Sequence, residues 1–341
     1  MARRLLIALG GNAIKQSHEL GTTEEQFRNV QNTVKQISEV IKRGSKEDRL
    51  AITHGNGPQV GNLLLQQEVS SHLLPPQSLD VISAMTQGQI GYMIQQSLTN
   101  MLKKIGGFAS KIPVISIVNQ VLVRKDDPDF RDPSKPIGNF LSKKEVEVLV
   151  KEKGFILNPP PGDAFLDKKL KGLVIKQVKP ATYEKPYRRV VPSPDPIQNI
   201  EGEFIRMSID SGAIVICSGG GGIPVILNEK GEYEGVFAVI DKDLAGERVA
   251  EAIGANEFII LTDVEYVKLN YGKSNEENVK SMSVNDAKKY LLEGHFLQGS
   301  MEPKIKACIR FLEWGGERAA IGHLNKTLEV VEGRNGTQIY R

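Results

Sequence analysis

Glycine-rich turns follow three apolar runs of the sequence, and each turn could bind an anionic group. The longest turn, 219–222, follows the apolar run 213–217, and the other two begin at Gly10 and Gly55. Glycine lets consecutive backbone N–H groups point at one ligand without an intervening Cβ, and such turns bind phosphate. A single loop of this kind is commonly only a tight turn. Three of them at the carboxyl ends of predicted strands indicate a phosphate-binding cleft.

Three lysines stand where a cation could neutralise a transferred phosphoryl group. Lys242 and Asp243 lie at the predicted start of one helix, Lys304 lies at the start of another, and Lys135 stands between two prolines. Asp243 could hold the lysines, or it could simply cap its helix. Lys135 could equally belong to a surface turn. The residue types are therefore those of a phosphate-handling enzyme, with structural alternatives for each.

Other common chemistries find little support in the sequence. No GxxxxGK[ST] motif occurs, and Gly55, Gly57 and Gly61 have the wrong spacing for GxGxxG, so the usual nucleotide-binding folds are not indicated. His54 and His295 are interpreted as structural histidines, His54 hydrogen-bonded to backbone, and neither is placed in the catalytic set.

Composition favours a cytoplasmic enzyme that acts on small molecules. The 341 residues carry 44 basic and 41 acidic side chains, and this net charge of +3 is too even to indicate a nucleic-acid or membrane partner. The first apolar run is too short for a signal sequence or a membrane span. Cys217 and Cys308 are predicted to be buried, reduced thiols, because no neighbouring cysteine or histidine pair suggests a metal site.

The elements that must position these residues alternate as strands and helices. Apolar residues at 30, 34, 37, 40 and 41 share one face of a predicted helix over 24–43. This order predicts a mostly parallel sheet covered by helices. Further helices are expected over 80–104, 243–253, 283–292 and 303–314, and further strands over 114–118, 236–240 and 258–261.

The alternation stops between about 121 and 195, where prolines and lysines become frequent. This interval is interpreted as a small inserted subdomain. Residues 151–189 include ten basic and four acidic side chains. They predict either a solvated surface or a docking patch for an acidic partner.

Taken together, the segments closely resemble the carbamate kinases of the amino-acid kinase superfamily over nearly the whole chain. The segments that carry the resemblance are ALGGNA at 8–13, HGNGPQVGNLLLQ at 54–66, AMTQG at 84–88, KPIG at 135–138, VVPSP at 190–194, GGGGIP at 219–224, IDKD at 240–243 and LTDV at 261–264.

The resemblance implies reversible phosphoryl transfer between ATP and carbamate with Mg²⁺, which is held mainly through the nucleotide phosphates. In the family this reaction usually forms ATP from carbamoyl phosphate during arginine catabolism. The implied fold is a three-layer α/β/α sandwich with a mostly parallel central sheet and a small protruding subdomain, assembled as a homodimer. Residues 1–212, including the subdomain at about 121–195, would form the carbamate lobe, and residues 213–341 would form the nucleotide lobe.

The family's site residues match this sequence by motif. Carbamate and the transferred group would be held by Gly10, Gly11, Asn12, Gly55 and Asn56, and the catalytic residues would be Lys135, Lys242, Asp243 and Lys304. The nucleotide would contact Gly219, Gly220, Gly221, Thr262, Asp263, Val264, Tyr266, Val267, Tyr271 and Met301. Acetylglutamate-type kinases carry a lysine where this chain has Ala8, and the resemblance implies that Lys135 on the subdomain replaces that charge. No residue is assigned as a metal ligand.

The resemblance breaks at residues 181–187, where the family usually has a short Asp-Ala-Gly-Arg-Gly-Trp tract. Three alternatives therefore stay open from the sequence. The protein could phosphorylate another small carboxylate or phosphonate on the same fold. It could work in the direction that makes carbamoyl phosphate. It could also be a catalytically silent nucleotide-binding sensor with the basic insertion as its interface.

Overall fold

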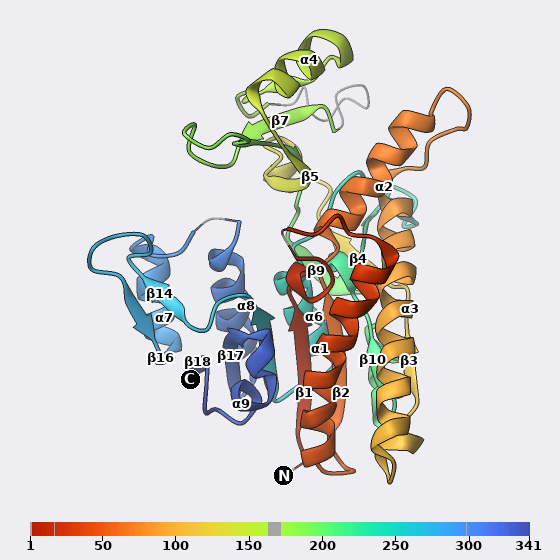
Figure 1. Cartoon of the computed structure of the whole chain (residues 1–341), viewed down its shortest axis with the longest axis vertical. Helices are drawn as coiled ribbons and strands as arrows, with labels where there is room; N and C mark the ends of the chain where they lie inside the picture. Colours follow the sequence, from red (N-terminus) through yellow and green to blue (C-terminus); the bar gives the residue numbers. More distant parts are fainter. Residues whose placement is uncertain (1, 17, 163–171, 298) are drawn as a thin grey trace.

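The computed structural model describes residues 2–16, 18–162, 172–297 and 299–341, and its centre is an eight-stranded sheet (Figure 1). The strand order is β16-β18-β17-β13-β1-β2-β10-β3, in which β17 and β18 are antiparallel and every other neighbouring pair is parallel. The bounds are β1 (Arg4–Leu9), β2 (Arg49–His54), β3 (Val114–Ser116), β10 (Ile214–Ile216), β13 (Glu257–Thr262), β16 (Ser281–Ser283), β17 (Arg318–His323) and β18 (Thr337–Tyr340).

Helices cover both faces of this sheet. Successive side chains of a strand point to opposite faces, and here the side chains on both faces are apolar and need covering. On β1, Leu5, Ile7 and Leu9 pack in one apolar cluster with α1 and α3, whereas Leu6 and Ala8 pack in another with α5, α6 and α8. The predicted three-layer α/β/α fold with a mostly parallel sheet is therefore confirmed. The helices are α1 (Thr23–Arg43), α2 (Gly57–Ser70), α3 (Leu79–Ile105), α4 (Lys143–Lys153), α5 (Gly202–Asp210), α6 (Lys242–Ile253), α7 (Val284–Leu292), α8 (Met301–Trp314) and α9 (Thr327–Val331).

Local sequence signals explain where several helices begin and end. The side chain of Thr22 accepts a hydrogen bond from the backbone of Glu25, and the Glu25 side chain returns one, which makes a capping box at the start of α1. The long helix α3 ends before Gly106, which has a positive φ of 75°. Both helices lie within a residue of their predicted bounds. No helix among the described residues is long and apolar enough to cross a bilayer.

The strand predicted over 236–240 is wrong. The last strand of a second sheet, β12 (Tyr233–Gly235), ends just before it, and the segment that follows is irregular, with Ala238, Val239 and Ile240 buried. The reason is that its backbone bonds go to separate partners, since Val236 N donates to Pro224 O and Val239 N donates to Pro192 O. The other strands of this sheet are β11 (Ile223–Leu227), β4 (Gln120–Val123) and β9 (Pro196–Asn199).

A small four-stranded sheet with α4 protrudes beyond α2, at the top of Figure 1. Its order is β5-β8-β7-β6, with bounds β5 (Lys135–Leu141), β8 (Tyr187–Val191), β7 (Val174–Gln177) and β6 (Ile156–Leu157). Part of the basic insertion, 163–171, lies outside the described residues. Arg189 of β8 forms an ion pair with Glu68 of α2, 2.5 Å between Nη1 and Oε1, which ties the protrusion to the main body. The lobe boundaries given above stay a prediction.

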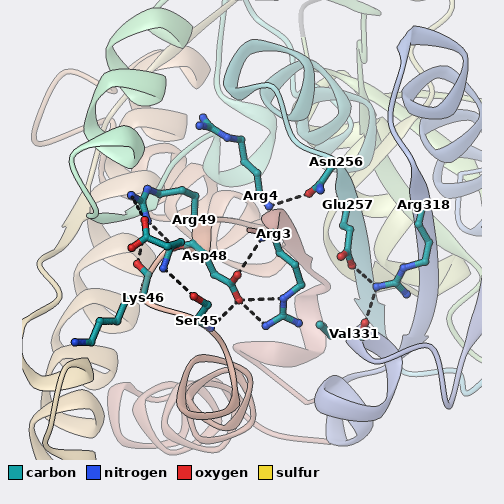
Figure 2. A network of polar contacts seen from close by, with 11 residues as sticks. Arg3, Arg4, Ser45, Lys46, Asp48, Arg49, Asn256, Glu257, Arg318 and Val331 are labelled. Atoms are coloured by element: carbon teal, nitrogen blue, oxygen red, sulfur yellow. Dashed lines mark hydrogen bonds and ion pairs between the residues drawn. The ribbon is translucent and has the colours of Figure 1, made fainter. Parts of the chain in front are cut away.

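Arginine side chains fasten the amino ends of the central strands, as Figure 2 shows. Arg3 donates from its backbone N and its Nε to the two carboxylate oxygens of Asp48, each at 3.0 Å. Arg318 of β17 forms an ion pair with Glu257 of β13 and donates to the carbonyl of Val331. These contacts hold one end of the sheet, and the glycine loops lie at the other end.

Both cysteines are buried, as the sequence predicts. Cys217 is 1% exposed and Cys308 is fully enclosed. Burial raises the pKa of the Cys217 thiol to about 12 and raises that of Cys308 as well, so neither forms a thiolate near neutral pH.

Candidate active site

Two of the three glycine loops meet at the carboxyl ends of β1 and β2. The backbone N–H of Gly10 donates to Leu261 O at 2.8 Å, and that of Gly55 donates to Leu9 O at 3.0 Å. A Cβ on Gly55 would lie 3.5 Å from the backbone N of Gly11 and 3.4 Å from Cδ of Lys242. These two of the three predicted loops therefore lie beside each other and beside a lysine.

The third loop, Gly219–Gly221 with Gly222, is buried and tightly packed. A Cβ on Gly220 would lie 2.0 Å from Nδ2 of Asn56, and its φ of +65° disfavours other residues. A Cβ on Gly219 would lie 2.4 Å from the His54 ring. Close packing accounts for these glycines, and neither of the two cavities described below is lined by them. Their contact with nucleotide stays a prediction.

Asp243 joins the two predicted phosphate-binding lysines. It is 2% exposed, and its carboxylate accepts a hydrogen bond from Lys242 Nζ and lies 3.2 Å from Lys304 Nζ. Lys304 also donates to the carbonyl of Ser300 at 3.0 Å. Two ammonium groups and one carboxylate leave a net positive charge, which suits a bound phosphate.

Asp243 does not cap its helix, so that alternative is wrong. The cap of α6 is Asp241, whose Oδ1 accepts the N–H of Asp243 at 2.9 Å and that of Leu244 at 3.5 Å. The N-cap residue stands immediately before the first helical residue. Because α6 begins at Lys242, its N-cap is Asp241, and Asp243 already lies inside the helix. The Asp243 carboxylate is therefore free to bind the lysines.

The pKa values of the two lysines move in opposite directions. Burial lowers the pKa of Lys242, and although Asp243 opposes this effect, the charge of Lys304 adds to it. Burial also acts against the charged form of Lys304, but Asp243 and Asp241 outweigh it and raise the pKa of Lys304. The carboxylates therefore favour the cationic form that a phosphate ligand needs.

Lys135 reaches the same site from the protruding sheet. It is the first residue of β5, and its Nζ forms an ion pair with Oδ2 of Asp241. Sequence reasoning assigned no role to Asp241, which contacts Lys135 here. Its signal was present, since the Asp-Lys-Asp run at 241–243 offers two carboxylates around one lysine.

A first cavity of about 190 Å³ opens at this point and is lined by Gly10, Gly11, Asn12, Ala13, Lys242, Leu261, Thr262, Asp263, Lys304 and Leu324. Asn12 Nδ2 donates to Asp263 Oδ2 at 3.0 Å, and Thr262 donates to the other oxygen of that carboxylate at 3.1 Å. Asn56, by contrast, is buried and donates to Thr86 Oγ1 at 2.9 Å, so it supports the loop from behind.

A second cavity adjoins the first, and Asp263 lines both. Its lining includes the predicted Val264, Tyr266, Tyr271 and Met301, together with Lys268, His295, Phe296, Leu297 and Ser300, which sequence reasoning did not assign to a site. Its side chains offer aromatic and apolar surface of the kind that binds a nucleobase. Val267 does not line it, because its side chain is buried in the core and its N–H donates to Thr337 Oγ1 at 2.8 Å.

His54 is a structural histidine, as predicted. It is 1% exposed, and its Nδ1 lies 3.0 Å from the carbonyl of Gly55. Burial lowers the pKa of His54 to about 4, so the ring is neutral at pH 7 and offers no charge to the site.

Comparison with known proteins assigns the family. A sequence model of the Amino acid kinase family matches residues 3–323. The chain is 47% identical to carbamate kinase from Pyrococcus furiosus and 48% identical to that from Thermococcus kodakarensis, with 99% of both chains covered in each case. The chain belongs to the carbamate kinases of the amino acid kinase family.

Solved structures agree with this family assignment. The structure of carbamate kinase from Giardia lamblia bound to AMP-PNP matches with a TM-score of 0.81 at 34% identity and covers 99% of this chain and 98% of that one. The same enzyme bound to citric acid matches with a TM-score of 0.85 at 32% identity, with the same coverage. The fold implied by the resemblance is thus the fold of the carbamate kinase family.

One buried carboxyl group of this carbamate kinase family member was not anticipated. Glu247 of α6 is fully buried, four residues after Asp243, and neither of its oxygens accepts a hydrogen bond from a described residue. Arg248 Nε lies 3.2 Å from Oε2, but without hydrogen-bond geometry. Burial raises the pKa of Glu247 to about 7, although Arg248 opposes the shift.

Glu247→Gln should therefore stabilise the protein more at pH 8 than at pH 5. A folded-state pKa raised above the unfolded value means that the folded protein binds the extra proton, so this group costs stability as the pH rises from about 4.5 to 7. A neutral glutamine avoids that cost, which is roughly 3 kcal/mol at pH 8. Urea unfolding at both pH values measures it, with exposed Glu203→Gln as control. Equal effects at the two pH values would contradict this account.

Proposed function

We propose that this protein transfers a phosphoryl group between ATP and carbamate, reversibly, as its relatives' names indicate. The observation that supports this most is the placement of Lys242 and Lys304 on one buried carboxylate, at a cavity lined by glycine backbone. Such a cluster of cations and N–H groups suits a group that carries several negative charges and needs positioning more than covalent chemistry.

The two adjoining cavities suggest how the substrates are arranged. Adenosine would occupy the second cavity, against Tyr266, Tyr271 and Met301, and its phosphates would extend past Asp263 into the first. Carbamate or carbamoyl phosphate would bind from the side of Gly11 and Gly55. The transferred phosphoryl group would then lie between the two substrates, next to the lysines.

Transfer in this arrangement is in-line and forms no covalent intermediate with the protein. Carbamate is already anionic, so no general base is needed, and the neutral, buried His54 is consistent with that. Lys242 and Lys304 would balance the charge on the phosphoryl oxygens, and Asp243 would keep their ammonium groups in place.

Mg²⁺ fits this site as an ion held mainly by the nucleotide phosphates. The described residues contain no cluster of three or more His, Cys, Asp or Glu that could hold a metal. Asp263 is the carboxylate that lines the first cavity, and one carboxylate together with phosphate oxygens is a common magnesium environment. When bound, the ion would neutralise phosphate charge.

The family resemblance further leads us to propose a homodimer that forms ATP during arginine catabolism. Exposed apolar side chains on two neighbouring helices, Leu65 and Val69 of α2 with Val81, Met85 and Tyr92 of α3, support a second copy as partner. Sedimentation velocity distinguishes a dimer from a 37.6 kDa monomer.

The proposed activity is tested by ATP formation from carbamoyl phosphate and ADP with Mg²⁺. Acetyl phosphate and acetylglutamyl phosphate serve as alternative donors. Rapid turnover selective for carbamoyl phosphate is the expected result. Turnover with another donor instead would identify a kinase of a different carboxylate. ADP binding without turnover of any donor would overturn the proposal in favour of a nucleotide sensor.

A further inference from the structure

The carboxylate of Asp241 connects the protruding sheet to the helix that carries Lys242. Its Oδ1 accepts the N–H groups at the start of α6, and its Oδ2 binds Lys135 Nζ. One carboxylate oxygen thus binds the backbone of the main body, and the other binds a side chain of the protruding sheet. The Asp241 side chain is 11% exposed and that of Lys135 is 24% exposed, so the ion pair is mostly shielded from water.

Packing on both sides fixes the distance between these two residues. Ile137, two residues after Lys135, and Val239, two residues before Asp241, belong to one buried apolar cluster with Val60 and Leu64 of α2. Lys135 also pairs with Val191 across β5 and β8, and the next residue along, Pro192, accepts the N–H of Val239 at 2.9 Å. The backbones that carry the two side chains are therefore bound to each other.

The protruding sheet approaches α2 closely at the same place. A Cβ on Gly61 of α2 would lie 2.2 Å from the Cα of Gly138 in β5, so only glycine allows this approach. Because the backbone of β5 is held against α2, the Lys135 ammonium group needs only a side-chain partner to fix its position. Asp241 is that partner.

We propose that Asp241 is a positioning residue that holds the Lys135 ammonium group beside the site of phosphoryl transfer. This inference rests on the proposed function, because it concerns the cation that the protrusion adds to that site. A lysine ammonium has three N–H donors, so Lys135 can stay bound to Asp241 and still donate to a phosphoryl oxygen. Asp241 therefore acts through Lys135 and does not itself need to contact substrate.

The charges around Asp241 agree with this role. Burial alone would raise the pKa of its carboxyl group, but Lys135, Lys242 and Lys304 lower it below its ordinary value. One ionised carboxylate thus attracts lysine ammonium groups from three separate elements, which are β5, α6 and α8.

The substitution that tests this role first is Asp241→Asn. Asparagine caps helices about as well as aspartate, so α6 keeps its N-terminal hydrogen bonds while Lys135 loses its charged partner. We expect turnover of carbamoyl phosphate and ADP to fall by about 10²-fold, since misplacing a catalytic group by about 1 Å has an effect of this size. ADP affinity, measured by calorimetry, should not weaken.

A double-mutant cycle with Lys135→Met tests whether Asp241 acts through Lys135. If it does, Asp241→Asn should change the rate less than about threefold in the Lys135→Met background, because coupled residues are not additive. Full loss in both backgrounds would overturn the proposal. Asp132→Asn is the matched control, because it removes the carboxylate partner of Lys176 within the protruding sheet and should leave turnover unchanged.

A second readout does not depend on turnover. Acetic anhydride labelling followed by mass spectrometry measures the reactivity of each lysine, and Asp241→Asn should raise labelling of Lys135 several-fold with no change at Lys176. Unchanged labelling of Lys135 would refute the positioning role, even in an active enzyme. If Asp241→Asn raises the labelling of Lys135 but the wild-type protein shows no turnover of carbamoyl phosphate, the positioning contact is supported and only the proposed function is overturned.

Discussion

Replacing Lys242 by methionine should slow ATP formation by about 10²–10³-fold while the protein stays folded. Methionine keeps an unbranched apolar stem of similar length but removes the charge at the cavity beside Gly11 and Gly55. Asp243 retains Lys304 as a partner, so no buried carboxylate is left without a cation. Initial rates at saturating ADP and carbamoyl phosphate, with a thermal unfolding curve, measure both effects.

Lys306→Met is the matched control for this experiment. Lys306 lies on α8, its side chain is 44% exposed, and its partner is Glu302 on the same helix. Its loss should leave the rate within about twofold, because exposed ion pairs contribute little. If Lys242→Met also kept a rate within about threefold of wild type, Lys242 would have no catalytic role.

Replacing Asp243 by asparagine should destabilise the protein by roughly 3–5 kcal/mol, because it removes the carboxylate that contacts both buried cations. The side chains of Lys242 and Lys304 are only 12% and 13% exposed, so water screens them weakly. The substitution should also lower the pKa of Lys304, which Asp243 now raises. Urea unfolding at pH 7.5 measures the free energy of unfolding.

Adding Lys304→Met to Asp243→Asn makes this test more specific. If the instability comes from uncompensated positive charge, removing one of the two cations should restore part of the lost free energy. A double variant that is less stable than Asp243→Asn alone would show that packing, and not charge, dominates at this position.

The sequence permits prediction of most of the fold because its signals are local. The 3.6-residue period of apolar side chains defines α1, and glycines at strand ends predict where the loops of β1 and β2 meet. The prediction of a strand over 236–240 was wrong because a continuous apolar run has no alternation of polar and apolar residues. Without that alternation, the sequence does not distinguish a buried strand from a buried irregular segment. Its backbone N–H groups bond to two different segments, since Val236 bonds to Pro224 of the neighbouring β11 and Val239 bonds to the more distant Pro192.

The site could be predicted only in part, for a similar reason. Lys242, Lys304 and the glycines at 10 and 11 stand at element ends, where sequence marks them, and the structure brings them to one cavity. Phe296 and Leu297 line the second cavity together with Lys268 of β14 (Val267–Leu269), and no local sequence pattern predicts that these separate segments meet. β14 pairs with β15 (Glu277–Val279) outside the central sheet.

The run of glycines at 219–222 shows how one residue pattern can have two physical causes. Glycine suits a turn that binds an anion, and it equally suits a turn that other side chains approach closely. Here His54 and Asn56 occupy the space that a Cβ on Gly219 or Gly220 would need. Only the three-dimensional neighbours separate the two causes, and these come from β2 and the loop that follows it.

The first turn of α8 contributes to both cavities, with Met301 lining the second and Lys304 lining the first. Three residues of a helix span about 4.5 Å along its axis, a separation that backbone hydrogen bonds make rigid. In the proposed complex, this turn would set the distance between the adenosine and the phosphate chain of the nucleotide. A nucleotide with a single phosphate would not span that distance, so one turn of backbone would make the proposed site select nucleotides by the length of their phosphate chain.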